Sequence, residues 1–431
     1  MFDLSPAFEL LIFLSAIVWG ARFGGLGLGM AGGTILCVLV LGGGTHPAPP
    51  PVDVMLIIMA VVTAAACLEG GGGGRYMIAV AERVLRRHPH RIALLAPAST
   101  YLATALCGTG YVSVALFRVI SEVSIQAGIR PERPLSAALI AIQQAILVSP
   151  VSAATAALLA VLLPLGISWA EILLITLPAT LLGSAAAVAA AAWRRSDLPP
   201  APTMAAPPEA VAPIQPHERR ALWAFVATVA EAIAVSACDT LRPQWSAGEQ
   251  TVRLGVASAL QIVMLGGSLF IAWAGRASSE AILETRVFRS GMMGAVSIFG
   301  IVWASDTLLL KHHAAVSVWA TNLVQAYPYS FAIVLFLAAA LLFSQSAAIR
   351  SLMPLGLMLG LPPATLVGMA TACSGYFLIP TGALAIACAS DRTGSTRIGR
   401  FLFDHSFLLP GLAATVVSVS AGSVFAWLRW A

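Results

Sequence analysis

Charged residues are scarce in this sequence: Asp, Glu, Lys and Arg make up only 10% of its 431 residues. Soluble domains contain about 25% of these four residue types, so the composition excludes a soluble globular protein. The six cysteines are scattered singly, with no Cys-x-x-Cys pair and no histidine at ligand spacing, which argues against a zinc site or a disulfide framework. No nucleophile–base spacing is present either. We therefore expect no enzyme, no metal, no cofactor and no nucleic-acid partner.

Hydrophobic residues make up 59% of the chain, and the mean hydropathy is +0.89. The N-terminus lacks the basic region and the cleavage site of a signal peptide, so the first apolar run is expected to stay as a membrane span. A spanning helix needs about 20 largely apolar residues. The sequence predicts ten such stretches, near 5–21, 24–44, 52–68, 135–163, 170–193, 221–238, 252–274, 291–310, 364–389 and 407–428.

The positions of the basic residues predict the orientation in the bilayer, because Lys and Arg stay on the cytoplasmic side in short loops. Alternating loops place most of the 24 basic residues on one side. The exceptions are Arg118, Arg242, Arg253, Lys311, Arg350 and Arg429. This arrangement predicts that both termini are periplasmic, provided that 92–127 and 329–361 each return to the side they came from.

Segment 92–127 has arginines on both flanks and the sequence Gly108-Thr109-Gly110 in its middle. It forms either two tight spans or a re-entrant hairpin. A helical arm of 16 residues reaches about 24 Å, less than the roughly 30 Å of the hydrocarbon core, which favours the hairpin. Non-helical backbone at membrane depth occurs only inside protein or beside a water-filled cavity. The turn therefore predicts a cavity.

The second half repeats this device, since Ser344-Gln345-Ser346 interrupts an apolar segment at 329–361. Each hairpin is followed by a span that breaks near its middle, at 148–155 and at 378–383. The sequence thus predicts an all-α protein with an inverted repeat, each half holding five spans and one re-entrant hairpin. The predicted halves are 1–193 and 221–431, and a Pro/Ala-rich cytoplasmic linker at 194–220 joins them.

Helix ends at the predicted breaks leave unpaired N–H groups, which favour an anion. Neutral polar groups surround them, and a small carboxylate is the ligand that fits this chemistry. In membrane helices, Ser and Thr also often bond only to the backbone or to a neighbouring helix. The candidate binding residues are Gly108, Thr109, Gly110, Ser113, Ser149, Ser152, Thr155, Ser344, Gln345, Ser346, Ser374 and Thr381.

Several further charged or ionisable residues lie within or beside apolar segments. Arg350 has no acidic residue at helical spacing in its own hairpin, so it is a candidate ligand for a carboxylate. Arg118 lies four residues before Glu122, which favours an ion pair on one helix face. Asp306 and Glu69 are candidates for proton coupling, or else interfacial carboxylates. His312-His313 is expected in an external loop.

The same residues resemble a known family. The stretches "GTGYVSVALFRVISEV", "SPVSAAT", "LFSQSAAIRSLMP" and "DRTGSTRIGRFLFDHSFLLPG" are similar to the anaerobic four-carbon dicarboxylate (Dcu) transporter family, and the similarity extends along the chain apart from the linker. The resemblance implies an ion-transporter-type fold. It also implies exchange of fumarate, malate or aspartate for succinate across a bacterial inner membrane.

Two other functions stay open at this stage: a carrier of another small organic anion, and a membrane sensor that binds dicarboxylate without moving it. The expected partners are small dicarboxylates and the lipid bilayer. The sequence leaves the coupling ion, the direction of transport and the oligomeric state open, a homo-oligomer included.

Overall fold

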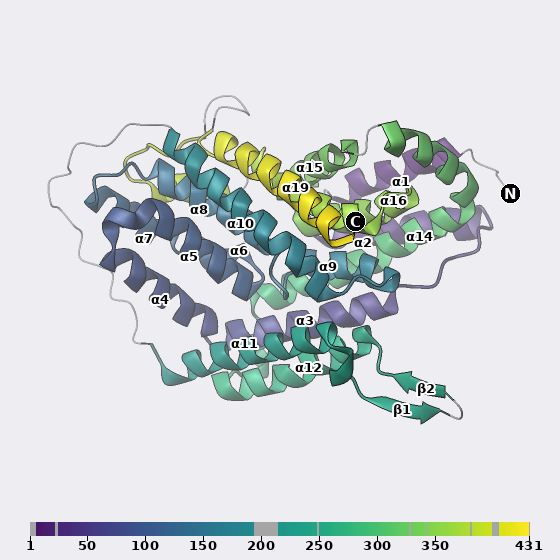
Figure 1. The fold of residues 1–431 in the computed structure, drawn as a ribbon, viewed down its shortest axis with the longest axis horizontal. Helices are drawn as coiled ribbons and strands as arrows, with labels where there is room; N and C mark the ends of the chain where they lie inside the picture. The colour runs from purple at the N-terminus through teal and green to yellow at the C-terminus, as the bar shows by residue number, and fades with distance from the viewer. Residues whose placement is uncertain are drawn as a thin grey trace.

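The computed structural model describes residues 6–21, 25–193, 214–247, 250–326, 329–342, 344–379, 382–398 and 405–430. Within these residues the chain is helical apart from one antiparallel pair of strands, β1 (Gln244–Ala247) and β2 (Gln250–Arg253). Figure 1 shows the helices packed into one body, from which the two strands project. The fold is therefore all-α, as the sequence predicts.

The described part of the first half contains ten α-helices. They are α1 (Pro6–Ala21), α2 (Gly25–Leu36), α3 (Val52–Gly70), α4 (Gly73–Arg87), α5 (Ile92–Cys107), α6 (Gly110–Val114), α7 (Phe117–Gln126), α8 (Glu132–Ile146), α9 (Ala153–Leu162) and α10 (Trp169–Trp193). A π-helical segment, η1 (Cys37–Gly42), extends α2. Short 3₁₀ turns, η2 (Pro89–Arg91) and η3 (Leu163–Leu165), precede α5 and follow α9.

The described part of the second half contains nine α-helices and two 3₁₀ segments. Its helices are α11 (Pro216–Ala237), η4 (Asp239–Leu241), α12 (Val256–Gly275), α13 (Ser279–Leu283), α14 (Arg286–Ala326), α15 (Ser330–Leu342), α16 (Gln345–Met358), α17 (Pro363–Met369), η5 (Ala370–Phe377), α18 (Gly382–Ser390) and α19 (Leu408–Trp430). Most of the predicted linker, 194–213, lies outside the described residues, and α11 already begins at Pro216.

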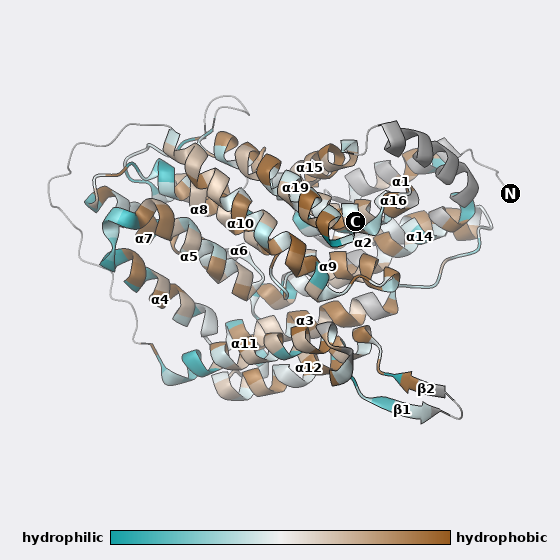
Figure 2. Cartoon of the chain, in the orientation of Figure 1, coloured by the Kyte–Doolittle hydropathy of each residue, from teal (hydrophilic) through white to brown (hydrophobic). Residues whose placement is uncertain are grey.

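Four described helices are long and apolar enough to cross a bilayer. They are Trp169–Trp193, Val256–Gly275, Arg286–His312 and Leu408–Trp430. A fifth candidate is the pair Met55–Gly70 and Gly73–Arg87, which is bent by 61°. Other predicted spans are shorter or interrupted helices in the structure. The chain is nevertheless a multi-pass membrane protein, and its hydrophobic helices dominate Figure 2.

The helices are interrupted at the four places that the sequence predicts. α5 ends at Cys107, just before the Gly-Thr-Gly turn, and α15 ends at Leu342, just before Ser344. The later breaks separate α8 from α9 and η5 from α18. Pro380 and Thr381, in the last break, lie outside the described residues. Small, polar and proline residues mark all four interruptions, which is why the sequence could locate them.

Helices of one half pack on helices of the other. α2 packs on α14, α3 packs on α12, and α10 packs along α19 (Figure 1). Within the first half, α8 packs on both α5 and α10. In the second half, η5 packs on α15, and α17 packs on α19. Two packing arrangements of the first half thus have counterparts in the second.

The crossing of α2 and α14 is very close, because glycines face each other there. A Cβ atom added to Gly32 would lie 2.1 Å from the main-chain carbon of Gly300, and one added to Gly300 would lie 2.0 Å from the oxygen of Gly29. No side chain fits between these backbones. Glycine is therefore required at the crossing, and the two halves are held together there by direct backbone contact.

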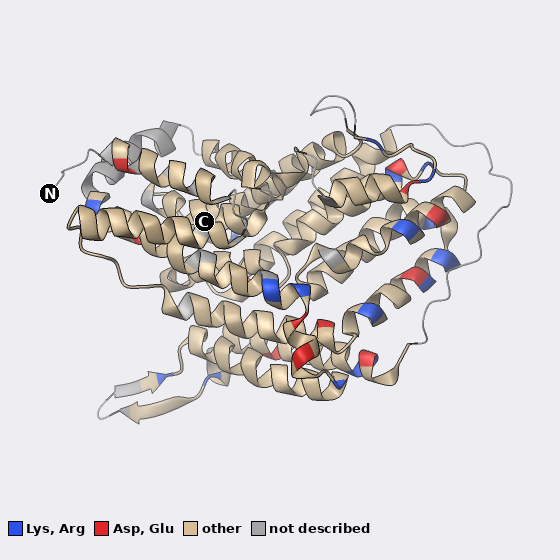
Figure 3. Cartoon of the chain, turned by 180° about the vertical axis from the view of Figure 1, so that it is seen from behind, with Lys and Arg blue, Asp and Glu red and all other residues tan. Residues whose placement is uncertain are grey.

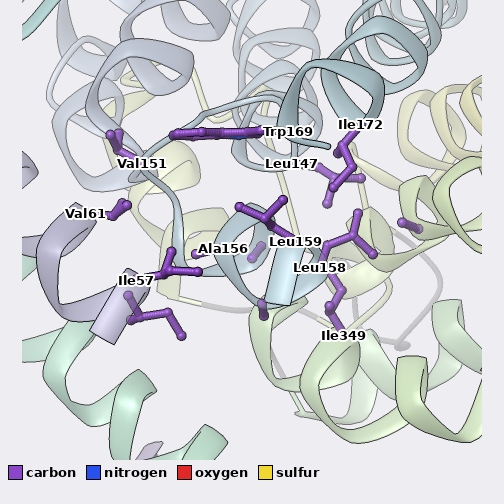
Figure 4. Packing of buried hydrophobic residues seen from close by; sticks show 14 of the residues in the cluster. Ile57, Val61, Leu147, Val151, Ala156, Leu158, Leu159, Trp169, Ile172 and Ile349 are labelled. Atoms are coloured by element: carbon purple, nitrogen blue, oxygen red, sulfur yellow. The ribbon is translucent and has the colours of Figure 1, made fainter. Parts of the chain in front are cut away.

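The largest apolar cluster surrounds α9. Figure 4 shows Leu158 of α9 near Ile349 of α16, whereas Val151 of the preceding break lies on the other side of the view, beside Val61. Few charged residues lie in this region, Arg350 being one of them, and Figure 3 shows many of the others at the end of the molecule that holds α4 and α7. The broken helices thus meet inside an apolar interior, where every polar group needs a partner.

Candidate functional site

The tip of the first hairpin packs directly on the break between α8 and α9. Gly108 has φ of +71°, a left-handed conformation that glycine adopts without strain. A Cβ atom on Gly108 would lie 2.8 Å from the Val151 oxygen, and one on Gly110 would lie 2.6 Å from Cγ2 of Ile142. Thr109 lies half-buried between these two glycines. The predicted turn is therefore buried against the first broken span.

The tip of the second hairpin reaches the same broken span. Ser344 is the N-cap of α16, and its hydroxyl accepts a hydrogen bond from the Ala347 N–H at 3.2 Å. The Ser346 hydroxyl lies 3.2 Å from it. The Gln345 side chain donates from Nε2 to the main-chain oxygen of Gln143 at 2.6 Å. Both hairpin tips thus contact the end of α8.

The N-terminus of α9 is capped from within the break. Ser152 is its N-cap and accepts from the Thr155 N–H at 3.0 Å. The Thr155 hydroxyl donates to the Leu147 oxygen at 2.8 Å. Ser149 is fully buried, and its hydroxyl lies 3.4 Å from the Val151 N–H. The hydroxyls of Ser152 and Thr155 therefore hold the broken helix in shape.

Arg350 lies on α16, and its cationic side chain is buried without a partner in the described structure. It is 5% exposed, and its Nε and Nη1 atoms are buried without a hydrogen-bond acceptor. An added Cβ on Gly294 of α14 would lie 3.4 Å from Nη1 and 3.9 Å from the Cβ of Ala153. The guanidinium thus lies between α14 and the start of α9.

Several predicted site residues have structural partners instead. Ser113 donates to the Thr100 oxygen at 3.1 Å and lies 2.7 Å from the Thr104 hydroxyl, so it joins the two arms of its hairpin. Ser374 donates to the Thr371 oxygen at 2.7 Å. Thr381 lies outside the described residues.

Two adjacent glutamines at the end of α8 were missed by the sequence reasoning. Gln143 is 1% exposed, and neither atom of its amide has a partner. The Gln144 side chain donates from Nε2 to the Ser374 hydroxyl at 2.9 Å, which ties α8 to η5. The signal was present, because two amides in an otherwise apolar run just before a break are costly to bury without a purpose.

The two predicted coupling residues have no contact with Arg350 in the described part of the chain, although Glu69 lies close enough to Cys107, beside the first hairpin tip, to interact with it electrostatically. The Glu69 carboxylate accepts from the Val287 N–H at 3.2 Å, at the first turn of α14. Asp306 lies on α14, 12 residues from Gly294 (306 − 294), which is about 18 Å along the helix. The structure therefore does not bring Glu69 or Asp306 together with Arg350.

Glu122, which the sequence predicts to pair with Arg118, contacts an arginine of another helix in the structure. Glu122 accepts from Arg86 of α4 at 3.2 Å, and Arg86 also bonds to Glu82 at 2.8 Å. These contacts fasten the amphipathic helix α4 to α7. No group of three or more potential metal ligands occurs among the residues that the structure describes. The site therefore offers one guanidinium, amides, hydroxyls and helix N-termini, which is the chemistry of anion binding.

Comparison with known proteins connects this chemistry to a family. The profile of a family described as "Anaerobic c4-dicarboxylate membrane transporter" matches residues 6–429. The chain is 35% identical to a C4-dicarboxylate transporter DcuA of Wolinella succinogenes, over 97% of the chain and 98% of that protein. It is also 35% identical to an anaerobic C4-dicarboxylate transporter DcuB of Escherichia coli, over 97% of each, and to a DcuA of the same species, over 96% of the chain and 98% of that protein.

Proposed function

Because the chain belongs to the anaerobic C4-dicarboxylate membrane transporter family, we propose that it exchanges four-carbon dicarboxylates across the bacterial inner membrane. Its substrates are molecules such as fumarate, malate, aspartate and succinate. The curated relatives are named as transporters, so the chain is a transporter and not an enzyme. In the proposed cycle, the site opens to one side of the membrane at a time.

The observation that carries this proposal is the buried guanidinium of Arg350. A buried charge without a partner costs several kcal/mol, and a carboxylate held bidentately by the guanidinium offsets that cost. A dicarboxylate brings two negative charges into the interior. One fixed cation and the N-termini of α9 and α16 together match these charges better than dipoles alone.

The contacts between helices support an inverted repeat. The contacts of α2 with α14 and of α3 with α12 are those expected when two halves interlock across a pseudo-twofold axis in the membrane plane. We propose that 1–193 and 221–431 are the two repeats, and that 92–127 and 329–361 are re-entrant hairpins. The hairpins then approach one site from opposite sides of the membrane.

Long-range polar contacts support the proposed orientation. Two of them join segments expected on the periplasmic side: Glu9 with Lys311 at 2.6 Å and Glu171 with Arg429 at 3.2 Å. On the cytoplasmic side, Arg75 contacts Glu218 at 3.3 Å. The Glu132 N–H also donates there to the Ser395 hydroxyl, at 3.2 Å. Each pair joins two segments that are far apart in the sequence. In the proposed topology, the two residues of each pair lie on the same side of the membrane.

Counterflow in proteoliposomes tests the function directly. Vesicles that contain the purified protein are loaded with unlabelled succinate and diluted into labelled succinate, and the label should accumulate transiently inside. Fumarate, malate and aspartate should compete with the label, whereas a monocarboxylate of similar size should not. Vesicles without protein provide the baseline.

The same assay separates the alternatives. Competition by monocarboxylates as strong as that by dicarboxylates would identify a carrier of other organic anions. Binding of labelled succinate without any counterflow would identify a sensor. Either result would contradict dicarboxylate exchange by this chain.

A further inference from the structure

We infer that Gln143 and Gln345 recognise a hydrogen-bond donor on the substrate, so that the site favours C4 dicarboxylates with a hydroxyl or ammonium group at C2 over unsubstituted ones. This inference rests on the proposed function. It assigns a specificity role to two amides that lie where the two hairpin tips meet the end of α8.

The orientation of the Gln345 amide follows from its partner. The main-chain oxygen of Gln143 can only accept a hydrogen bond, so the atom of Gln345 that lies 2.6 Å away must be the donor Nε2. The other amide atom of Gln345 is therefore the acceptor Oε1. This oxygen is buried and has no donor among the described residues. Gln345 is only 4% exposed, so bulk water does not supply one.

Gln143 lies at the same place with an unused amide. Its neighbour Ile142 faces Gly110 of the first hairpin tip, and its own main-chain oxygen faces the second tip. Its side chain is buried, and both Nε2 and Oε1 lack a partner in the described structure. The amides of Gln143 and Gln345 therefore present one free donor and two free acceptors where the hairpin tips meet α8, and Oε1 of Gln144 is a further buried acceptor without a partner in the described structure.

These free groups specify the ligand. At neutral pH, the carboxylates of a dicarboxylate offer only acceptors, which suit Arg350 and the Nε2 atom of Gln143. The two amide oxygens need a donor, and an unsubstituted dicarboxylate has none. A hydroxyl or ammonium group at C2 supplies it. A site built to bond to such a group disfavours the analogue that lacks it, because its polar groups then stay buried and unpaired.

L-Malate and succinate differ by one hydroxyl group, which makes them the matched probes. In the counterflow assay, the concentration that halves labelled-substrate accumulation is measured for each. We expect the wild-type protein to bind L-malate about tenfold more tightly than succinate. L-Malate forms one more neutral hydrogen bond, and succinate leaves the same amide oxygen buried and unpaired. Gln143→Met should weaken both compounds, because the Nε2 donor to a carboxylate is lost, but it should weaken L-malate severalfold more than succinate and so lower the preference.

Gln143→Met keeps the contact between the hairpin and α8, since Gln345 bonds to the main chain of residue 143. Gln345→Met should also abolish the preference, with an added loss common to both substrates because that contact disappears. The control is Gln144→Met, which removes the bond to Ser374 and should leave the ratio of the two affinities unchanged. Should Gln143→Met not fold, Gln143→Asn shortens the amide and should lower the same ratio.

Equal affinities of the wild-type protein for L-malate and succinate would overturn the inference, as would a ratio that Gln143→Met leaves intact. In both cases exchange itself continues, so the proposed function stands. If the wild-type protein exchanges neither compound, the proposed function itself fails. The two failures are therefore distinguishable in one set of vesicles.

Discussion

At the scale of single residues, the polar side chains near the hairpin tips fall into two groups. Ser113, Ser152 and Thr155 use their hydroxyls to hold helices in place. Arg350 and Gln143 have buried polar atoms without partners in the described structure. The first group should affect stability when it is changed, and the second should affect binding.

Replacing Arg350 should act on substrate binding. Arg350→Ala should weaken dicarboxylate affinity about 10- to 100-fold, since a hydrogen bond to a charged group contributes about 1.5–3 kcal/mol. Arg350→Lys keeps the charge but loses the fork geometry, so it should exchange substrates with lower affinity. The measurement is competition in the counterflow assay, with folding checked by thermal unfolding in detergent. Unchanged affinity in a folded Arg350→Ala protein would remove the residue from the site.

Replacing Ser152 should act on stability. Ser152→Ala removes the cap of α9 and should lower the free energy of unfolding by about 1 kcal/mol. Ser152→Asn supplies another capping side chain and should restore most of it. The unfolding midpoint of each purified variant provides the comparison. A midpoint for Ser152→Ala equal to that of the wild type would contradict the capping role.

The sequence could single out Arg350 as a candidate, because an intramembrane charge is visible in any apolar segment. It could not separate Ser152 from Ser149, since both lie in the same break and only the helix start decides which one caps α9. Gln143 was missed for a related reason. Whether a glutamine near the end of α8 finds hydrogen-bond partners depends on the second hairpin, whose Gln345 is 202 residues away in the sequence.

At the scale of helices and turns, the tip of the first hairpin depends on glycine. Gly108→Ala should be strongly destabilising, because the left-handed conformation costs about 1–2 kcal/mol for alanine and the new Cβ would also press on the Val151 oxygen. Gly166 provides a matched control. Its φ is +83°, but a Cβ there meets no atom within 4 Å, so Gly166→Ala should show the conformational cost alone.

Thermal unfolding of both variants measures the difference between them. Gly108→Ala should have the lower midpoint and should also lose exchange activity, since the tip packs on the broken span. Equal midpoints would mean that the hairpin tip moves away from Val151 at little cost.

The loop between α18 and α19 should respond to acid. Burial acts to raise the pKa of Asp391, but hydrogen bonds from Thr393, Thr396 and Ser395 outweigh it and lower the pKa below the ordinary value. A lowered folded-state pKa adds stability that is fully present above about pH 4 and is lost as the pH falls through the folded-state pKa. Asp391→Asn should therefore be less stable than the wild type at pH 7.

The stability difference between Asp391→Asn and the wild type should stay constant from pH 7 to pH 5 and shrink below pH 4. Chemical denaturation at each pH measures it. A difference that is independent of pH down to pH 3 would exclude the carboxylate as its source.

The positions of the helix breaks could be predicted because glycine, proline and serine interrupt apolar runs. One loop was predicted wrongly. His312-His313 was expected in an external loop, but His312 lies within α14, where its ring contacts the Glu9 carboxylate at 2.6 Å. The backbone of His312 departs from helical geometry, with φ of −113°. This contact with another helix accompanies a kink within α14, and local sequence carries no sign of it.

At the scale of the whole molecule, the first hairpin fixes a testable orientation. His90 precedes the hairpin, Gln126 lies near its end, and both are exposed. Cysteines at these positions, in a protein without its native cysteines, should be labelled by a membrane-impermeant thiol reagent from the cytoplasmic side only. Inside-out and right-side-out vesicles give the two measurements. Labelling of the two positions from opposite sides would show that 92–127 crosses the membrane.

The sequence predicted two halves with similar order but not how they fit together. Hydropathy reports which residues avoid water, and both lipid and protein satisfy that requirement. It therefore cannot tell which face of α2 meets α14. The glycines at 29, 32 and 300 form this crossing, yet glycine is common throughout the chain.

The crossing of α2 and α14 also bears on how the protein is made. The ribosome completes α2 more than 250 residues before it completes α14, and α3 likewise waits for α12 (300 − 32 = 268 for the facing glycines). Until then, the early helices must remain in the bilayer with their tightest packing surfaces turned toward lipid or toward temporary neighbours. Domains usually fold as units during synthesis, first half first. Here the first half gains its final neighbours only when translation is nearly finished, so the nascent protein spends most of its synthesis as an incomplete assembly.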